Sequence, residues 1–513
     1  MRLRLAIAIA AASGFLALSY EIVWYRIVSV MTGGTAPSFG LLLAAYLFGL
    51  ALGSRGSAVF CRDDVDALGG EAGARVLRIL AVFVAAANIV AALVIPAFGW
   101  SARFTDARLG IAMVALGAAL LGAVLPLVSH LGIEPDERAG ARLSYIYLAN
   151  ILGSSAGSLL TGFVLMDRLP LVAIAQLLAA SGFVLAAALV AASRPSRAVA
   201  ALAYGVSAAS GLGAFLVMPV LCDRIYERLV YKHEFDGSQR FAQLVENKSG
   251  VIAVTRDGTV YGGGAYDGVL NITLQENEKN GIVRAYLAGA LHGAPREVLM
   301  VGLSSGSWAQ VVAHLPGLER LTIVEINPGY VEIVAAHAEV ASLLTNPKVE
   351  IVFDDGRRWL QRHPEARFDL VVMNTTMHWR AHATNILSTE FLEIARPHLR
   401  AGGVLYFNTT DSYDVQLTAA KTFPHFKRIA NFVAVSDSPF EFDRDRWRRL
   451  LETMTIEGRP LLDLSKASDR RIYDDLSGYN DMEPAWSILD RYEKTRTVVT
   501  DDNMVVEWRT TSR

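Results

Sequence analysis

Polar residues suited to binding or transforming a small molecule follow several strand-like segments in the second half of the chain. The segment 297–301 runs directly into Gly302-Leu-Ser-Ser305-Gly306, and a helical stretch follows. A glycine turn of this kind lets a ligand approach the backbone N–H groups at the start of a helix. Because many α/β proteins use glycine there only to turn the chain, this turn alone is weak evidence of a binding site.

Acidic residues end the next two strand-like segments. Glu325 ends the segment 321–325, about twenty residues after the glycines, where a carboxylate would accept hydrogen bonds from a ribose diol. The alternative for Glu325 is a solvated acid at a strand end. Asp354-Asp355-Gly356 follow the segment 349–353, and an acid at this edge suits an exocyclic amine. The pattern predicts a nucleoside site.

Two later segments end in polar runs that could complete this site. The segment 368–373 ends in Asn374-Thr375-Thr376-Met377-His378, an unusually polar link between a strand and a helix. We interpret this run as the reaction loop. The segment 403–407 ends in Asn408-Thr409-Thr410 and could close the same crevice.

The elements that must position these residues alternate between strand and helix, which favours a doubly wound, Rossmann-like α/β sheet. The strand-end clusters converge only in such a sheet, because ligands bind outside the carboxyl ends of its strands. Short strands with turns at Asp257-Gly258 and Asp267-Gly268 precede it and indicate a small β-rich subdomain. We place the linker and this subdomain at 222–290 and the Rossmann-like nucleoside-binding domain at 291–513.

The first 221 residues are poor in charge and consist of long apolar runs. Over the whole chain, 52% of residues are hydrophobic and only 19% are charged. This composition is more hydrophobic than a soluble enzyme of this size requires. A helix crosses the hydrocarbon with about 20 apolar residues, so residues 1–221 are predicted to be an α-helical transmembrane bundle. The predicted spans are 5–31, 37–60, 76–99, 109–131, 141–165, 169–193 and 198–221.

Two features of these spans point to close packing or to a polar pathway. Gly49-x-x-x-Gly53 and Gly153-x-x-x-Gly157 place small residues on one helical face, where two backbones can approach closely. Glu21 and Arg26 lie inside the first span, and charges at membrane depth pair or face a polar cavity. A buried structural pair and a transport or substrate pathway are both open.

The membrane topology contains a conflict. An inside N-terminus puts most basic loop residues inside, which is the usual bias, yet seven spans would then place the C-terminal domain outside. The basic residues Arg224, Arg228 and Lys232 follow the last span and weaken that count. Because a nucleoside substrate is expected in the cytoplasm, we favour a cytoplasmic domain.

Charge and cysteine content exclude other classes. The formal net charge is −2, so no global basic field exists to attract nucleic acid, and a nucleic-acid partner is disfavoured. The only two cysteines, Cys61 and Cys222, exclude a disulfide framework and a cysteine zinc site, and we predict no metal centre.

The order of these motifs resembles the spermidine synthase (polyamine aminopropyltransferase) family over roughly residues 240–430. The family's Leu-Asp-Gly-x-x-Gln strand matches Asp267-Gly268-Val-Leu-Asn271, and its Gly-Gly-Gly-Asp-Gly-Gly loop matches residues 302–307. Its Val-Glu-Ile-Asp motif, whose glutamate binds the ribose, matches residues 324–327, and its adenine site matches Asp355-Gly356. The resemblance implies a small β domain followed by a methyltransferase-like Rossmann domain. The membrane half is similar to multi-span regions fused to such domains in bacteria.

The departures from the family concern the amine acceptor. Transferring members carry an Asp-Ser-x-Asp-Pro loop whose aspartate takes a proton from the attacking amine, and Asn374 stands in its place. An amide cannot serve as that base. The Tyr-Gln pair of the polyamine site corresponds to Asn280-Gly281, and the aspartate of the glycine loop corresponds to Ser305. His378 could replace the missing base or be an ordinary loop histidine.

The leading hypothesis is therefore an enzyme that binds S-adenosylmethionine, or its decarboxylated form, and releases 5′-methylthioadenosine without transfer to a diamine. No cofactor is expected beyond that substrate. The predicted catalytic residues are Asn374 and His378, and the predicted substrate-binding residues are Asp267, Asn271, Gly302, Ser305, Glu325, Asp354, Asp355, Gly356 and Thr375.

Two alternatives stay open. One is a genuine polyamine aminopropyltransferase with an altered acceptor site, and the other is a non-catalytic, nucleoside-sensing membrane transporter that would use Glu21 and Arg26. In each case we expect an integral protein of a bacterial inner membrane. Its expected partners are the lipid bilayer and a small nucleoside, and a homodimer is left open.

Overall fold

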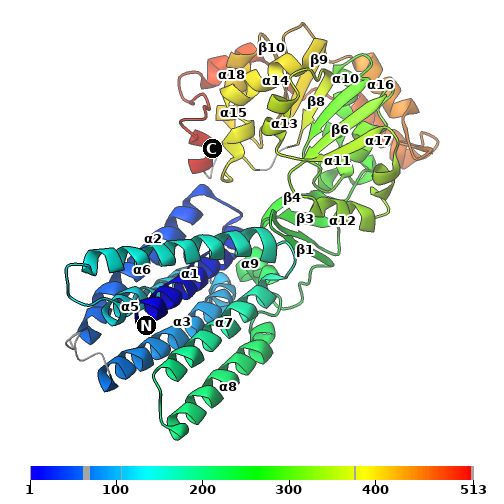
Figure 1. Ribbon diagram of the computed structural model, residues 1–513. Coiled ribbons are helices and arrows are strands. Elements are labelled where there is room, and N and C mark those ends of the chain that lie inside the picture. Colours follow the sequence, from blue (N-terminus) through cyan, green and yellow to red (C-terminus); the bar gives the residue numbers. More distant parts are fainter. Residues whose placement is uncertain (1, 62–69, 105–106, 375–376, 510–513) are drawn as a thin grey trace. The chain divides into compact units, whose positions relative to one another are not determined.

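The computed structural model describes residues 2–61, 70–104, 107–374 and 377–509 and contains two compact units (Figure 1). The helical unit comprises Met1–Arg240 and Glu246–Val251, and the α/β unit comprises Phe241–Val245 and Ile252–Arg513. The chain therefore passes between the units three times within a dozen residues.

Among the residues that the structure describes, seven helices of the helical unit are long and apolar enough to cross a membrane, as the sequence predicts. Helices suit this role because all their backbone hydrogen bonds are made within the segment. The fourth of these spans consists of α4 and α5, and a short π-helix extends the fifth beyond α6. The helices are α1 (Arg2–Thr32), α2 (Ala36–Ser57), α3 (Glu71–Ala102), α4 (Arg108–Gly122), α5 (Val124–Gly132), α6 (Ala139–Leu159), α7 (Leu171–Ala192), α8 (Arg197–Leu221) and the shorter α9 (Ile225–Tyr231).

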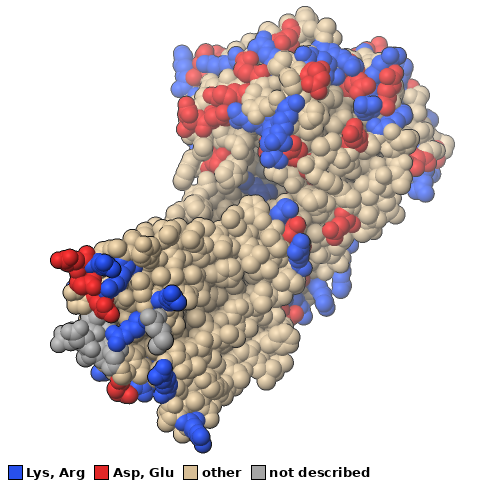
Figure 2. Space-filling view, in the orientation of Figure 1, with Lys and Arg blue, Asp and Glu red and all other residues tan. Residues whose placement is uncertain are grey.

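The surface of the spans is apolar. In the view of Figure 2, the helical unit shows a broad uncharged face, and its Lys, Arg, Asp and Glu side chains gather at the helix ends. The α/β unit carries both signs of charge across its surface in the same view. This distribution suits a bundle in contact with lipid and a domain in contact with water.

The predicted glycine motifs lie where helices pack most closely. A Cβ atom at Gly49 would lie 2.3 Å from the Ala115 carbonyl oxygen of α4, and one at Gly153 would lie 2.0 Å from the Ala11 carbonyl oxygen of α1. Such approaches leave no space for any side chain. The α1–α6 and α2–α4 contacts therefore depend on glycine, as expected for small residues at a membrane helix interface.

Arg26 and Glu21 do not form the buried pair that was one expectation. Among the described residues no ion pair joins them, and Arg26 instead donates from Nη1 to the Asn247 carbonyl oxygen at 2.8 Å and from Nη2 to the Lys248 carbonyl oxygen at 3.1 Å. Both acceptors belong to the segment 246–251 of the helical unit. The guanidinium thus satisfies backbone carbonyls at the end of the bundle.

The small β-rich lead-in is confirmed as a four-stranded sheet with the order β1-β2-β3-β4. β2 pairs antiparallel with β3, and β3 with β4. Glycines at the turns, such as Gly258 with φ +83°, allow the chain to reverse between these short strands. The strands are β1 (Gln243–Asn247), β2 (Gly250–Val254), β3 (Thr259–Gly262) and β4 (Ala265–Val269).

The large sheet has eight strands in the order β14-β10-β11-β9-β8-β5-β6-β7. The predicted parallel arrangement holds for β7, β6, β5, β8 and β9, but β11, β10 and β14 extend the sheet in an antiparallel manner. Only Ala430 and Asn431 separate β10 from β11, and so short a link cannot make a parallel crossover. The strands are β5 (Glu297–Val301), β6 (Arg320–Glu325), β7 (Val349–Phe353), β8 (Phe368–Met373), β9 (Leu399–Asn408), β10 (His425–Ile429), β11 (Phe432–Ser436) and β14 (Met482–Pro484).

Helices cover both faces of this sheet, which explains the continuous apolar runs of its central strands. Along β5, Val298 and Met300 join the core formed with α10, α11, α12 and α16, whereas Leu299 and Val301 join the core formed with α13, α14, α15 and α18. The helices are α10 (Val283–Leu291), α11 (Ser307–Ala313), α12 (Gly329–Ala336), α13 (Gly356–Arg362), α14 (Thr389–Ala395), α15 (Tyr413–Thr422), α16 (Arg444–Thr453), α17 (Ala467–Ser477) and α18 (Ala485–Tyr492).

Candidate active site

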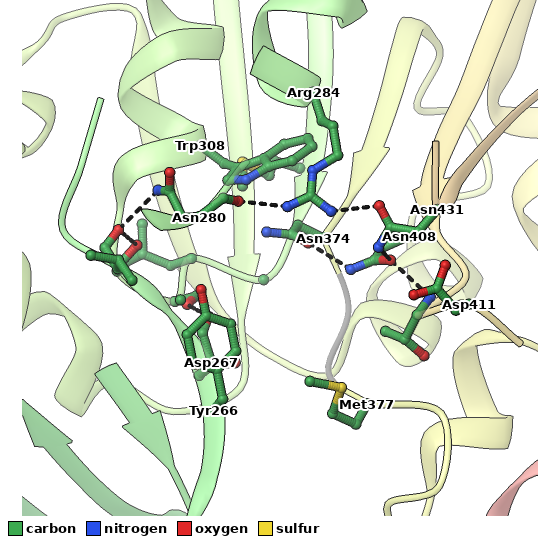
Figure 3. Close-up of a pocket in the computed structure, with 18 residues that line it drawn as sticks. Tyr266, Asp267, Asn280, Arg284, Trp308, Asn374, Met377, Asn408, Asp411 and Asn431 are labelled. Carbon is green, nitrogen blue, oxygen red and sulfur yellow. Dashed lines mark hydrogen bonds between the residues drawn. The ribbon is translucent and has the colours of Figure 1, made fainter. Parts of the chain in front are cut away.

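A cavity of 170 Å³ opens in the α/β unit at the carboxyl ends of β5, β8 and β9 (Figure 3). In the sheet, β5 lies between β6 and β8. The chain adds β6 and β7 on one side of β5 and then β8 and β9 on the other, so the strand order reverses at β5. Open α/β sheets bind ligands at such a point. Its lining residues are Tyr266, Asp267, Gly268, Val269, Asn280, Arg284, Met300, Gly302, Leu303, Ser304, Ser305, Trp308, Asn374, Met377, Asn408, Thr410, Asp411 and Asn431.

The glycine turn after β5 forms one wall of the cavity. Gly302 and Gly306 adopt φ angles of +92° and +77°, which side-chain-bearing residues rarely do. Ser304 also adopts a positive φ of 48°, so the turn is tight along its whole length. The predicted residues Gly302 and Ser305 both line the cavity, and the Ser305 hydroxyl donates to the Val269 carbonyl oxygen at 3.3 Å.

Glu325 holds the glycine turn from behind. Its Oε2 accepts a hydrogen bond from the Leu303 N–H at 2.6 Å, and its Oε1 accepts one from the Asn327 N–H at 2.7 Å. Burial raises the pKa of Glu325 to about 7, although these backbone hydrogen bonds oppose the shift. Glu325 lies behind the lining residues rather than among them, and its ribose-binding role stays a prediction.

Asp267 joins the small sheet to the same wall. The Tyr330 hydroxyl donates to Asp267 Oδ2, and the Ser304 hydroxyl donates to the Asp267 carbonyl oxygen at 2.6 Å. Burial raises the pKa of Asp267, while the Tyr330 hydrogen bond lowers it. Because the residue lines the cavity, its carboxyl group is placed to meet a cationic part of a ligand.

Three asparagines form the opposite wall and hydrogen-bond in series (Figure 3). Asn408 Nδ2 donates to Asn374 Oδ1 at 3.1 Å, and Asn431 Nδ2 donates to Asn408 Oδ1 at 2.9 Å. These bonds orient the Asn374 amide, which the resemblance noted in the sequence predicts to occupy the family's base position. Thr375, a predicted binding residue, lies outside the described residues.

His378 is buried beneath the loop that follows β8, with 4% of its surface exposed. Its Nδ1 lies 2.8 Å from the Thr410 hydroxyl oxygen, and its backbone N–H donates to the same oxygen at 3.0 Å. Burial lowers the pKa of His378, so the neutral imidazole is favoured. The residue lies outside the cavity lining and orients Thr410, which belongs to it.

Asn271 is placed behind the cavity by its own hydrogen bonds. Its Nδ2 donates to the Glu276 carbonyl oxygen at 2.9 Å and to Asn280 Oδ1 at 3.2 Å, and its Oδ1 accepts from the Thr273 N–H at 2.9 Å. Asn271 is 3% exposed, and its hydrogen bonds shape the loop that leads to Asn280.

The acids after β7 have local structural partners. Asp354 forms ion pairs with Arg358 and Arg362, and these contacts outweigh the opposing effect of burial and lower the pKa of its carboxyl group. Asp355 caps α13 by accepting from the Arg358 N–H at 2.8 Å. A Cβ atom at Gly356 would lie 2.6 Å from Val301, so this glycine allows α13 to approach β5. None of the predicted residues Asp354, Asp355 and Gly356 is among the lining residues.

The sequence analysis missed Arg284, Asp411 and Asn431 as cavity residues. Arg284 is the one charged residue in the apolar helix α10, and that contrast was an available signal. Asn431 comes from the β10–β11 turn, for which the sequence offers only the ordinary preference of asparagine for turns. Asp411 has a positive φ of 62° beside the lining residue Thr410.

Comparison with known proteins fits this geometry. Residues 284–430 match the family model of the spermine/spermidine synthase domain. The α/β unit therefore contains a region similar to the spermine/spermidine synthase domain. The matched range runs from Arg284 in α10 to Ala430 after β10, and it includes the glycine turn and, of the asparagine wall, Asn374 and Asn408 but not Asn431.

Curated relatives agree with this assignment. A polyamine aminopropyltransferase of Mycobacterium tuberculosis is 26% identical over 432 residues, which cover 80% of this chain and 77% of the relative. The α/β unit is little more than half of the chain, so this alignment includes part of the helical unit as well. Polyamine aminopropyltransferase 1 of Pseudomonas aeruginosa is 29% identical over 166 residues, covering 31% of this chain and 57% of the relative.

Two solved structures match about half of the chain. A spermidine synthase in complex with the transition state analogue AdoDATO has a TM-score of 0.34 and 14% identity, covering 48% of this chain and 85% of that chain. The spermidine synthase of Thermotoga maritima has a TM-score of 0.33 and 14% identity, covering 48% and 82%.

Proposed function

We propose that the protein is a membrane-bound enzyme of the aminopropyltransferase type that cleaves the sulfonium of S-adenosylmethionine, or of its decarboxylated form, and releases 5′-methylthioadenosine without transfer to a diamine. The observation that carries this proposal is that Asn374, the residue which the resemblance matches to the family's base, lines the cavity and is held there by Asn408. A primary amide does not accept a proton from an ammonium at neutral pH.

The chemistry needs little help from a base because a sulfonium is already an excellent leaving group. When a carboxylate oxygen of S-adenosylmethionine attacks the γ-carbon, a C–O bond forms and the C–S bond breaks. The electron pair goes to sulfur, and the products are methylthioadenosine and an aminobutyrolactone, with no proton transferred. Water could attack the same carbon and would give up one proton. The cavity would act mainly by holding the reacting atoms in line.

The residues of the proposed site divide between the two ends of the donor. Glu325 would accept hydrogen bonds from the ribose hydroxyls, and Asp355 with the Gly356 backbone would bind the adenine. Asp267 and Ser305, which line the cavity, would hold the amino-acid chain beside the sulfonium. Asn374 would lie beside the γ-carbon.

Mass spectrometry of the purified full-length protein tests the proposal. The protein is incubated with S-adenosylmethionine and, separately, with its decarboxylated form. For each donor that is cleaved, the rate of methylthioadenosine release is expected to be the same with and without putrescine. An Asp267→Asn variant is expected to slow this release, and Asp257→Asn in an exposed turn is the matched control. Release that requires putrescine, or no release from either donor, would contradict the proposal.

A second candidate is aminopropyl transfer to an amine through a rearranged acceptor site. Asp411 favours it, because this carboxylate lines the cavity near Asn408 and could take the proton that Asn374 cannot. Diamine-dependent formation of spermidine, abolished by Asp411→Asn, would establish this function in place of the first.

We also propose that the spans lie in a bacterial inner membrane, that the α/β unit faces the cytoplasm and that two copies form a dimer. The basic residues Arg224, Arg228 and Lys232 after the last span support a cytoplasmic domain. A reporter fused to the C-terminus, active only in the cytoplasm, tests the orientation, and mass measurement in detergent tests the dimer. A reporter active only in the periplasm would contradict the proposed side.

A further inference from the structure

Arg284 brings a positive charge into the cavity. It is the only charged residue of α10, and its side chain extends between Asn280 and Asn431 (Figure 3). The aminopropyltransferase reaction uses a cationic acceptor, so a guanidinium in the wall is not expected of a site that binds a diamine. The inference below concerns what this charge binds, and it rests on the proposed function.

Neutral groups hold the guanidinium in place. Nη1 donates to Asn431 Oδ1 at 2.5 Å, Nη2 donates to the Asn280 carbonyl oxygen at 2.5 Å, and Nε donates to the Gly281 carbonyl oxygen at 2.9 Å. The guanidinium also lies over the Phe432 ring, 5.5 Å from its centroid. These contacts fix its position without neutralising its charge.

Gly281 provides the space for this arrangement. Its φ angle is +59°, and a Cβ atom there would lie 2.6 Å from Arg284 Nη2. Asn280 and Gly281 are the pair that replaces the family's Tyr-Gln at the polyamine site. Gly281 therefore leaves room for the guanidinium at the position where the resemblance places the family's polyamine pair.

The charge has capacity left for a ligand. A guanidinium has five N–H donors, and three have protein acceptors here. Within the described part of the chain no carboxylate lies at ion-pair distance from Arg284. A half-buried guanidinium with neutral partners and free donors is a site for a carboxylate or another planar anion.

We infer that Arg284 binds the α-carboxylate of the sulfonium donor, so that the substrate is S-adenosylmethionine itself and the decarboxylated form is disfavoured. Asp267 and Asp411 line the same cavity and suit the ammonium and sulfonium groups of that molecule. One carboxylate oxygen on Arg284 leaves the second free to attack the γ-carbon. The same guanidinium repels the ammonium of a diamine and so opposes aminopropyl transfer.

Binding of two unreactive nucleosides tests the assignment directly. S-Adenosylhomocysteine and its decarboxylated analogue differ in the carboxylate, and neither carries a sulfonium that can leave. Calorimetric titration of the full-length protein in detergent is expected to show that the wild type binds S-adenosylhomocysteine at least about 10-fold more tightly. Arg284→Gln should weaken that binding by about 10-fold to 100-fold, as for a lost hydrogen bond to a charged group, and leave the decarboxylated analogue within about 3-fold.

Two further variants make the test independent of folding defects. Asn431→Asp keeps Arg284 and its contact but adds a carboxylate beside it, and it should also remove the preference. Arg256→Gln removes a charge from an exposed turn of the same unit and should preserve the preference. Equal wild-type affinities, a preference that survives Arg284→Gln, or binding of neither nucleoside would overturn the inference.

The release assay separates this inference from the proposed function. In one outcome, the protein forms methylthioadenosine from the decarboxylated donor without a diamine and shows no preference for a carboxylate. This outcome would support the proposed function and overturn the role of Arg284. In the other outcome, the protein prefers the carboxylate through Arg284 but turns over only with a diamine. This outcome would support the role of Arg284 and contradict the proposed function.

Discussion

Glu325 is the residue whose protonation should control nucleoside binding. Burial raises its pKa to about 7 in the folded protein, from 4.5 for an unperturbed glutamate, so the protein binds this proton more tightly when folded. The contribution of Glu325 to folding stability therefore decreases as the pH rises from 4.5 through 7. The carboxylate form, however, is the better acceptor for ribose hydroxyls.

We therefore expect the affinity for methylthioadenosine to increase between about pH 6 and about pH 8, on either side of that pKa. Glu325→Gln should flatten this profile, because an amide does not titrate, and should weaken binding at the higher pH by about 1–3 kcal/mol. Titration calorimetry at several pH values measures both effects. A wild-type profile without pH dependence would contradict this assignment.

Asp355 has two predicted roles that substitution can separate. It caps α13 in the structure, and the resemblance noted in the sequence predicts that it binds the adenine. Asp355→Ala should lower the free energy of unfolding by about 0.5–2 kcal/mol through loss of the cap and should also weaken nucleoside binding. Asp355→Ser keeps a capping hydroxyl but lacks the reach to adenine. If Asp355→Ser binds methylthioadenosine like the wild type, Asp355 serves the helix alone.

Restoring a carboxylate at Asn374 should not create an aminopropyltransferase. In Asn374→Asp the new charge lies next to the Asn408 amide, but Arg284 still occupies the wall where a diamine ammonium would bind. Negative charge beside the sulfonium would stabilise the ground state more than the transition state, so methylthioadenosine release should fall. Kinetic assays with and without putrescine decide this. Efficient spermidine formation from the single change would show that the acceptor site is intact.

At the scale of elements, a methyl group added at one glycine should be enough to disturb the α2–α4 contact. A Cβ atom at Gly53 would lie 1.7 Å from the Ala119 carbonyl oxygen, whereas one at Gly56 in the same helix would meet nothing within 4 Å. Gly53→Ala should force the helices apart and destabilise the bundle by about 1–3 kcal/mol. Gly56→Ala should be neutral or slightly stabilising. Thermal unfolding in detergent compares them, and equal effects would contradict this account of the interface.

The elements that the sequence predicts well are those with one dominant signal. The seven spans follow from length and hydrophobicity, and β5 and β8 appear as continuous apolar runs because both faces of each strand are buried. The antiparallel strands β10, β11 and β14 were not predicted. The sequence of β10, His-Phe-Lys-Arg-Ile, breaks strict alternation, and β14 has three residues, so neither carries a strong pattern. β11 is a short apolar run, and periodicity alone does not identify such a run as a strand.

The sequence predicts the candidate-site residues that follow strands of the sheet, but not those that come from a neighbouring helix and a hairpin turn. Gly302, Ser305 and Asn374 follow strands, and a strand end is placed by topology once the sheet is recognised. Arg284 and Asn431 come from a helix and a hairpin turn, and only packing brings them together. Because these two residues are far apart in the sequence, no local pattern predicts their contact.

At the scale of the whole molecule, the α/β unit should fold and bind nucleoside without the bundle. All lining residues of the cavity lie between Tyr266 and Asn431, and both cores of the sheet consist of residues from the same unit. A fragment from residue 241 onward should bind methylthioadenosine within about 3-fold of the full-length protein. Calorimetry on a soluble, well-folded fragment checks this, and an absence of binding would mean that the site needs residues of the helical unit.

The contact of Arg26 with the 246–251 segment sets an order for biosynthesis. Arg26 belongs to the first span, and its acceptor Asn247 lies 221 residues further along the chain. Ribosomes add about 5–20 residues per second, so every newly made copy spends tens of seconds with this guanidinium deprived of its final acceptors. Helix α1 is thus among the last elements of the bundle to complete its polar contacts. A chain that stops before the β1–β2 turn lacks both of these carbonyl acceptors of Arg26.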